Sequence, residues 1–198
     1  MSISTFLKQS EYNSPETQVV CYLHWNFDHE KYPFPAHRKL AKKLIDIGAD
    51  VIIGNHSHVP QGGELHKGKP IIYGLGNFYI PNGEFFNGAL RYPEESMINC
   101  AFEIRKDEYV CHWLRFDPQQ NSLKIIKSEN FPKGLYNISY TPYAGMNNKK
   151  YDTFFKDNRK KKKLTPIFFD YKSSVGNLLK ELFMFIKIHF IRLLKRRG

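Results

Sequence analysis

Two short apolar runs with an amphipathic segment between them constrain the fold of this chain more than any other feature. Residues 18–23 (QVVCYL) and 50–53 (DVII) are apolar and rich in β-branched side chains, as buried strands are. Between them, residues 36–47 repeat Leu and Ile at helical spacing, with an outer face of Lys and Arg, and Gly48 follows as a helix end. Strand, helix and strand in this order predict a parallel βαβ unit and an α/β fold.

The chain after this unit changes character twice. Gly62 and Gly63 predict a turn before a third apolar run, residues 71–78 (IIYGLGNF). From residue 98 to 127, three alternating runs separated by turn signals predict an antiparallel meander. We therefore divide the chain into a frayed N-terminus, a folded domain, an irregular basic linker and a basic amphipathic helix, at residues 1–18, 19–130, 131–170 and 171–198.

The net charge of +11 is confined to the end of the chain. Residues 1–148 hold equal numbers of acidic and basic side chains, whereas residues 149–198 hold 15 Lys and Arg against four acidic residues. Residues 174–197 combine an apolar helical face with a cationic one. Such a helix suits the surface of an anionic membrane, or it packs on the domain with solvated lysines. Binding to nucleic acid is not favoured because the basic run carries no recognition motif.

The N-terminal residues, the length of the apolar runs and the cysteines together predict the cellular location. The N-terminal residues show no signal-peptide pattern, and no run approaches the roughly 18 uncharged apolar residues of a spanning helix. The three cysteines are an odd number without CxxC spacing, which favours free thiols and a reducing compartment, although a Cys100–Cys111 disulfide across a hairpin stays open. We expect a cytoplasmic protein, or one peripheral to the cytoplasmic membrane.

Histidines follow both strands of the predicted βαβ unit. His24 ends the first, and His56 and His58 follow the second behind the small Gly54. Carboxyl ends of adjacent parallel strands meet at one edge of a sheet, and imidazole suits first-row divalent metals. The His-x-His pair can face one ion or bridge two. The alternative is ordinary core or surface histidine, the interpretation we adopt for the other five: His29, His37, His66, His112 and His189.

The same segment resembles the bacterial CapA family of poly-γ-glutamate capsule synthesis proteins. The motifs His-Trp, GADVIIG, HSHV and LGNF occur in family order and spacing within residues 19–80. The family is similar in fold to calcineurin-like metallophosphoesterases. The resemblance therefore implies the C-terminal half of a metallophosphoesterase-like sandwich, built from the βαβ unit and the meander, with the C-terminal amphipathic helix attached.

The resemblance also implies roles for named residues. His24, His56 and His58 would be ligands of a divalent metal ion such as Mn, Fe or Zn. Asn77 of LGNF would lie near the site, although a turn after a strand explains it equally well. Asp28 stands where the family usually has Glu and would orient a ligand histidine. Other departures are Asn26 for Gly, Asn55 for the first His of the family's HHxH, and Gly74 for Ser.

The family's acidic and amide ligands come from a Gly-Asp strand end and an Asn loop that precede the matched segment. Residues 1–23 hold only Glu11 and Glu16 as carboxylates. A two-metal phosphoesterase needs a bridging carboxylate, so we expect weak or no hydrolase activity unless another chain supplies the missing half. Two hypotheses follow: a CapA-like capsule biosynthesis protein with a metal site, or an inactive scaffold that acts as a membrane-peripheral or interaction module.

Overall fold

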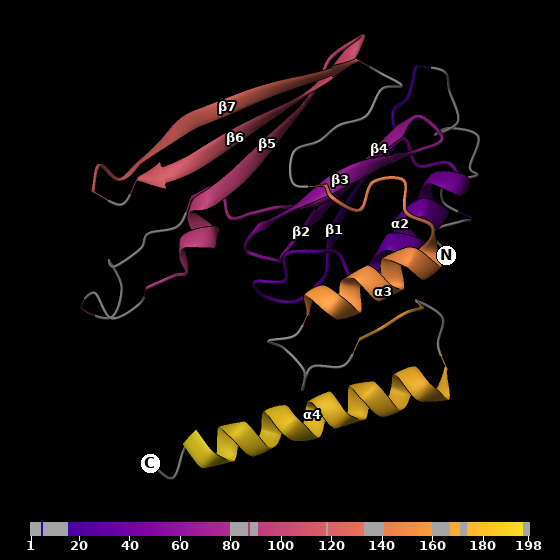
Figure 1. Ribbon diagram of the computed structural model, residues 1–198, viewed down its shortest axis with the longest axis vertical. Helices are drawn as coiled ribbons and strands as arrows, with labels where there is room; N and C mark the ends of the chain where they lie inside the picture. The colour runs from indigo at the N-terminus through magenta and orange to yellow at the C-terminus, as the bar shows by residue number, and fades with distance from the viewer. Residues whose placement is uncertain are drawn as a thin grey trace.

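Two sheets and three α-helices form the part of the chain that the structure describes, a mixed α/β arrangement (Figure 1). The computed structural model describes Thr5, Asn87 and residues 16–79, 91–117, 119–132, 141–159, 167–170 and 174–195. Most of the predicted frayed end at 1–18, and the parts of the predicted linker at 133–140 and 160–166, lie outside these residues.

The first sheet contains the predicted βαβ unit. Strands β1 (Val20–His24), β2 (Val51–Asn55) and β4 (Lys69–Leu75) run parallel, and β3 (Pro60–His66) pairs antiparallel with β4. The strand order is β1-β2-β4-β3. The chain crosses from β1 to β2 through the helix α2 (Pro35–Asp46), as predicted.

Strand β3 replaces the turn that we predicted at Gly62 and Gly63. Both glycines lie within β3, where the register with β4 shifts on either side of Gly62, and Gly62 has a φ of 75°. The actual reversal lies at Lys67 and Gly68, with φ values of 52° and 75°. Glycine therefore marks a β-bulge here, a use that local sequence does not distinguish from a turn.

Helix α2 is buried on more sides than its sequence predicted. Ala41, Leu44 and Ile45 pack on the sheet, but Arg38, assigned to the outer face, is fully buried. Its guanidinium donates two hydrogen bonds to the Glu64 carboxylate, at 2.5 and 2.7 Å, and lies 4.5 Å from the Tyr151 ring centre. A buried charge needs this pairing, and the segment that covers it is far away in sequence.

The covering segment is the helix α3 (Asn148–Asn158), which lies in the stretch 131–170 that we predicted to be an irregular linker. Asn147 caps it, because the side-chain oxygen accepts a hydrogen bond from the Lys150 amide at 3.0 Å. Tyr151 and Phe155 are buried in the core beside α2. The helix carries only two buried apolar side chains in a basic stretch, which explains its weak pattern.

The predicted meander forms a second, antiparallel sheet. It consists of β5 (Ile98–Ile104), β6 (Glu108–Asp117) and β7 (Ser122–Pro132), and the short 3-10 helix η2 (Glu94–Met97) precedes it. Ile72 of β4 packs with Cys100 and Trp113 of this sheet, whereas its neighbour Ile71 joins the core under α2. Since successive strand residues point to opposite faces, the two sheets pack face to face, with α2 on the far side. The cysteines are free thiols, so the hairpin disulfide is not formed.

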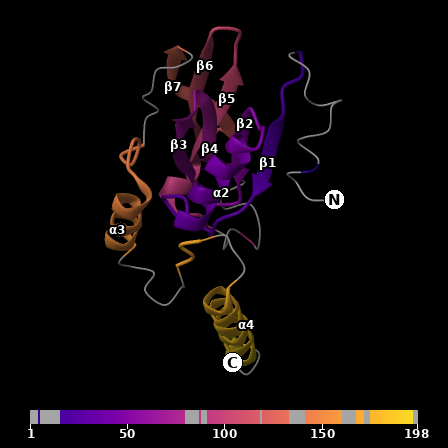
Figure 2. The ribbon, with the colours of Figure 1, turned by 90° about the vertical axis from the view of Figure 1, so that its right-hand side faces the viewer.

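Helix α4 (Val175–Lys195) confirms the predicted C-terminal helix. Figure 2 shows it lying apart from both sheets. Among the described helices, none is both long enough and apolar enough to cross a membrane.

Candidate metal centre

The three predicted histidines come together at one edge of the first sheet. β1 and β2 pair in parallel with His24 opposite Asn55, so the chain leaves both strands at the same edge. The ring centre of His24 lies 4.4 Å from that of His56, and His56 lies 5.8 Å from His58. The fold groups the three side chains, and their role as metal ligands stays a prediction.

Asp28 closes the group from the loop after β1. Its Oδ1 lies 3.5 Å from Nε2 of His56 and 3.7 Å from Nε2 of His58. Ligand atoms of the three residues lie within 4.8 Å of one another. Two ligands about 2.0–2.1 Å from a tetrahedral ion are roughly 3.4 Å apart, so these separations fit a shared divalent ion after small side-chain adjustments. The sequence had assigned Asp28 a supporting role, whereas the geometry places its carboxylate among the candidate ligand atoms.

The group is open to solvent. The side chain of Asp28 is 63% exposed, and those of His56 and His58 are 34% and 39% exposed. A structural metal site is usually closed by four protein ligands, whereas a reactive one keeps a position free for water or substrate. The solvent exposure of Asp28, His56 and His58 is like that of a metal site with a free position for water or substrate.

The backbone around the group adopts unusual conformations. Asn26, His29, His56 and His58 have φ values of 73°, 55°, 90° and 57°, all in the left-handed region. Such conformations cost free energy for a residue with a Cβ and persist where the surroundings fix them, often at functional sites. The two loops are therefore held in place by their tertiary contacts and not by local preference.

Asn77 fixes the orientation of His58. Its Oδ1 accepts a hydrogen bond from Nδ1 of His58 at 2.5 Å, and its Nδ2 donates to the His58 carbonyl at 3.1 Å. Buried Asn99 of β5 holds the loop in turn, since its Oδ1 accepts from the amides of Asn77 and Phe78 at 2.6 and 2.9 Å. A proton on Nδ1 leaves the Nε2 lone pair directed at Asp28 and His56, as metal ligation requires.

Replacing Asn77 by leucine is expected to weaken divalent-metal binding about 10-fold to 100-fold, because the tautomer and ring orientation of His58 lose their support. Isothermal titration with Zn²⁺ measures this change. Asn77→Asp, which keeps the acceptor, should bind within a few-fold of the unchanged chain. Equal affinity of Asn77→Leu and the unchanged chain would show that Asn77 only turns the backbone.

Asn26 has a structural task in the loop after β1. Its φ of 73° is one that glycine adopts freely and asparagine tolerates. Its Oδ1 accepts from the Phe34 amide at 3.1 Å and from Nδ1 of His37 at 2.8 Å, and its Nδ2 donates to Gln61 at 2.8 Å. The buried side chain thus ties the loop after β1 to α2 and β3.

His37 gives this connection a dependence on pH. Burial lowers the pKa of His37 from 6.5 to about 4, because the charged imidazolium is poorly solvated there. The unfolded chain then binds the proton more readily than the folded one. The free energy of unfolding should be intact above about pH 6.5 and should fall by up to about 3 kcal/mol as the pH drops towards 4.

Urea unfolding at pH 7 and pH 4.5 tests this prediction. His37→Phe removes the titrating group and keeps a ring to stack on Trp25, whose ring centre lies 5.2 Å away. The variant should lose less stability than the unchanged chain between the two pH values. An identical loss in both proteins would assign the acid sensitivity to other groups.

His29 is a site residue that the sequence patterns did not single out. Its amide donates to the Ser57 carbonyl at 2.8 Å, between His56 and His58, and its ring centre lies 5.9 Å from that of His58. Ser96 of η2 lies 3.1 Å from its Nδ1. The available signal was its position directly after Asp28. Asn55, in contrast, turns its side chain to Tyr22 and donates to the tyrosine hydroxyl at 2.8 Å.

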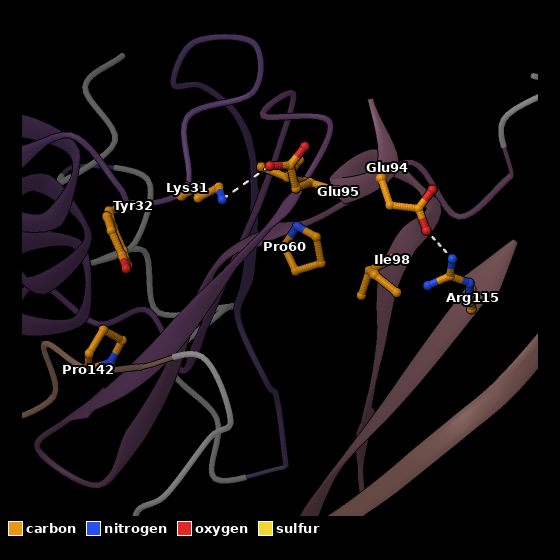
Figure 3. A pocket seen from close by; sticks show the side chains of 9 residues that line it. Lys31, Tyr32, Pro60, Glu94, Glu95, Ile98, Arg115 and Pro142 are labelled. Carbon is orange, nitrogen blue, oxygen red and sulfur yellow. Dashed lines mark hydrogen bonds and ion pairs between the residues drawn. The ribbon is translucent and has the colours of Figure 1, made fainter. Parts of the chain in front are cut away.

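A pocket of about 510 Å³ is lined by residues that stand next to site residues in the sequence (Figure 3). Val59 and Pro60 of its wall directly follow His58 in sequence, and Ile98 begins β5. Two ion pairs stand at its edge, Lys31 with Glu95 at 3.2 Å and Arg115 with Glu94. An apolar wall with a charged edge is typical of a ligand-binding pocket.

The sequence from the first strand to the loop of Asn77 matches a known family. Residues 5–82 match the bacterial capsule synthesis protein family PGA_cap. Through this segment the chain is similar to the PGA_cap family. All six residues assigned to the site, and His29, lie within the matched segment, so the candidate metal centre is part of a PGA_cap segment.

Curated relatives are similar to this chain over a third or somewhat more of its length. The capsule biosynthesis protein CapA of Bacillus anthracis is 42% identical over 65 residues, which are 33% of this chain and 16% of the relative. The PGA biosynthesis protein CapA of Bacillus subtilis is 40% identical over 65 residues, 33% of this chain and 17% of the relative. A probable polyglutamine synthesis accessory protein of Mycobacterium tuberculosis is 35% identical over 82 residues, 39% of this chain and 22% of the relative. The chain thus spans only about a sixth to a fifth of the length of these relatives.

Proposed function

We propose that this chain takes part in the synthesis of a capsule or exopolymer of the poly-γ-glutamate type, through a divalent-metal site of the metallophosphoesterase kind. The observation that supports the proposal most is the group of Asp28, His56 and His58, with His24 beside it, within a PGA_cap segment. The packing of the mixed sheet against the antiparallel sheet is compatible with one half of a metallophosphoesterase-like sandwich.

Each residue of the proposed site has a defined task. Asp28, His56 and His58 would hold the ion, and Asn77 orients His58 by accepting a hydrogen bond from its Nδ1–H. When bound, a divalent metal supplies Lewis-acid polarisation of a phosphoryl or acyl oxygen and acidifies water. The pocket lined by Val59, Pro60 and Ile98 would hold the substrate, with its methylene groups against the apolar wall.

A second candidate function is a non-catalytic scaffold that binds a membrane or another protein. The low negative charge of the site favours this function. Asp28 is the single carboxylate in the Asp28, His56 and His58 group found among the described residues. Two cations held close together need a bridging carboxylate and further acidic ligands. Hydrolysis by this chain alone is therefore expected to be weak, and a partner chain that supplies the missing ligands would restore it.

Metal analysis separates the two functions. After dialysis against Zn²⁺ or Mn²⁺, we expect about one ion per chain by mass spectrometry of the metal content, as a single His/Asp site would hold. The metal-loaded chain should also bind poly-γ-glutamate more tightly than the metal-free chain in a sedimentation assay. A chain that takes up no metal would refute the proposed site, and robust hydrolysis of a phosphodiester by the chain alone would refute the expected weak activity.

A further inference from the structure

Helix α4 exposes more apolar surface than any other described element. Nine of its apolar side chains are between 52% and 74% exposed: Val175, Leu178, Leu179, Leu182, Phe183, Phe185, Ile186, Phe190 and Leu193. Soluble monomers rarely leave a continuous apolar patch of this size in water. At about 1.5 Å per residue, the apolar face extends for roughly 30 Å.

The opposite face of α4 is turned towards the rest of the chain. Lys180 donates to the Ile167 carbonyl at 2.8 Å, and Asn177 donates to the Asp170 carbonyl at 3.0 Å. The segment 167–170 is itself fixed to α2, because the Phe168 carbonyl accepts from the Ala36 amide at 2.9 Å. These contacts with the body involve Asn177 and Lys180, whereas the nine apolar side chains stay exposed, and Figure 2 shows the helix lying apart from both sheets.

The charge around this face determines what can cover it. Lys187 lies at its border, Glu181 is the single acidic residue of α4, and the last fifty residues of the chain carry the whole net charge of +11. A second copy of α4 would bring like charges together. A bilayer with anionic headgroups would attract the positive charge of this region, and its acyl chains would cover the apolar face.

We propose that α4 binds the surface of an anionic lipid membrane, lying in the interface with Leu182, Ile186 and Phe190 in the acyl region and its lysines at the headgroups. Such a helix lies along the bilayer, consistent with the finding that no described helix could cross one. The side of α4 that carries Asn177 and Lys180, which holds segment 167–170, would then face away from the bilayer. This inference is independent of the metal site.

Flotation of the full chain with lipid vesicles tests the inference. We expect binding to vesicles of phosphatidylcholine with about 30% phosphatidylglycerol, and at least tenfold weaker binding to pure phosphatidylcholine. Raising the salt concentration should weaken the binding, because headgroup attraction is screened. The double variant L182E/I186E should lose at least tenfold in vesicle affinity.

The variant I188E/I191E is the matched control. It makes the same change in charge on the same helix, but at two side chains that are 42% exposed and lie on the opposite side. Its affinity should stay within about threefold of the unchanged chain. Equal losses in the two variants, or no binding of the full chain to anionic vesicles, would overturn the inference. So would a dimer in analytical ultracentrifugation that L182E/I186E converts to a monomer in the absence of vesicle binding.

Discussion

Replacing His56 and His58 together by alanine is expected to abolish stoichiometric binding of Zn²⁺ or Mn²⁺, with an affinity loss of at least about 100-fold. Both Nε2 atoms lie within 3.7 Å of the Asp28 carboxylate, so they are the two ligand atoms that a shared ion would use with it. The variant leaves Asp28 with His24 nearby, and one exposed carboxylate with a single imidazole does not retain a metal against dialysis. Isothermal titration and metal analysis give the affinity and the stoichiometry.

The double variant His66→Ala/His112→Ala is the control for this experiment. Each of these histidines also stands beside a carboxylate, His66 at 2.9 Å from Asp46 and His112 at 3.1 Å from Glu103, but they lie on different elements. The control removes the same two imidazoles and should bind metal like the unchanged chain. If both double variants lose metal equally, the ion is held by scattered surface histidines and the proposed centre is wrong.

The second large effect concerns folding. Gly54→Ala should destabilise the chain by about 3 kcal/mol or more, at the upper end of the overpacking range. A Cβ at Gly54 would collide with the Tyr73 carbonyl oxygen and with Nε1 of Trp25. These two atoms form a buried hydrogen bond of 2.9 Å that crosses the face of β2, so neither can move without loss of that bond. Urea denaturation followed by circular dichroism gives the free energy of unfolding.

Gly176→Ala provides the comparison, since the same methyl group is added in open space. Its nearest neighbour would be the Ser174 hydroxyl at 3.9 Å, and alanine favours the helix in which Gly176 lies. This control should unfold at the same urea concentration as the unchanged chain, or at a slightly higher one. A Gly54→Ala chain as stable as the control would mean that the indole of Trp25 can be displaced at little cost.

Gly54 illustrates how far sequence alone reaches. The sequence shows only that a small residue precedes the His-x-His pair. The structure gives the reason, because the indole of Trp25 passes over it to reach Tyr73. Trp25 and Tyr73 are 48 residues apart, and no local pattern reports such a contact. Asn26 is similar, since its hydrogen bonds to His37 and Gln61 appear only in the folded chain.

Local patterns in the sequence were sufficient to predict the βαβ unit and the meander, the grouping of His24, His56 and His58 at one edge, and the apolar and basic character of α4. These features depend on periodicity and on where short strands end, both of which are local. Tertiary packing, in contrast, put the carboxylate of Asp28 among the candidate ligand atoms, brought His29 to the site, buried Arg38 against Glu64, and connected His58 through Asn77 to Asn99 of the second sheet. Those contacts join segments far apart in the chain, or loops whose residues have positive φ. They form because of tertiary packing, and the local conformational preferences of the residues do not predict them.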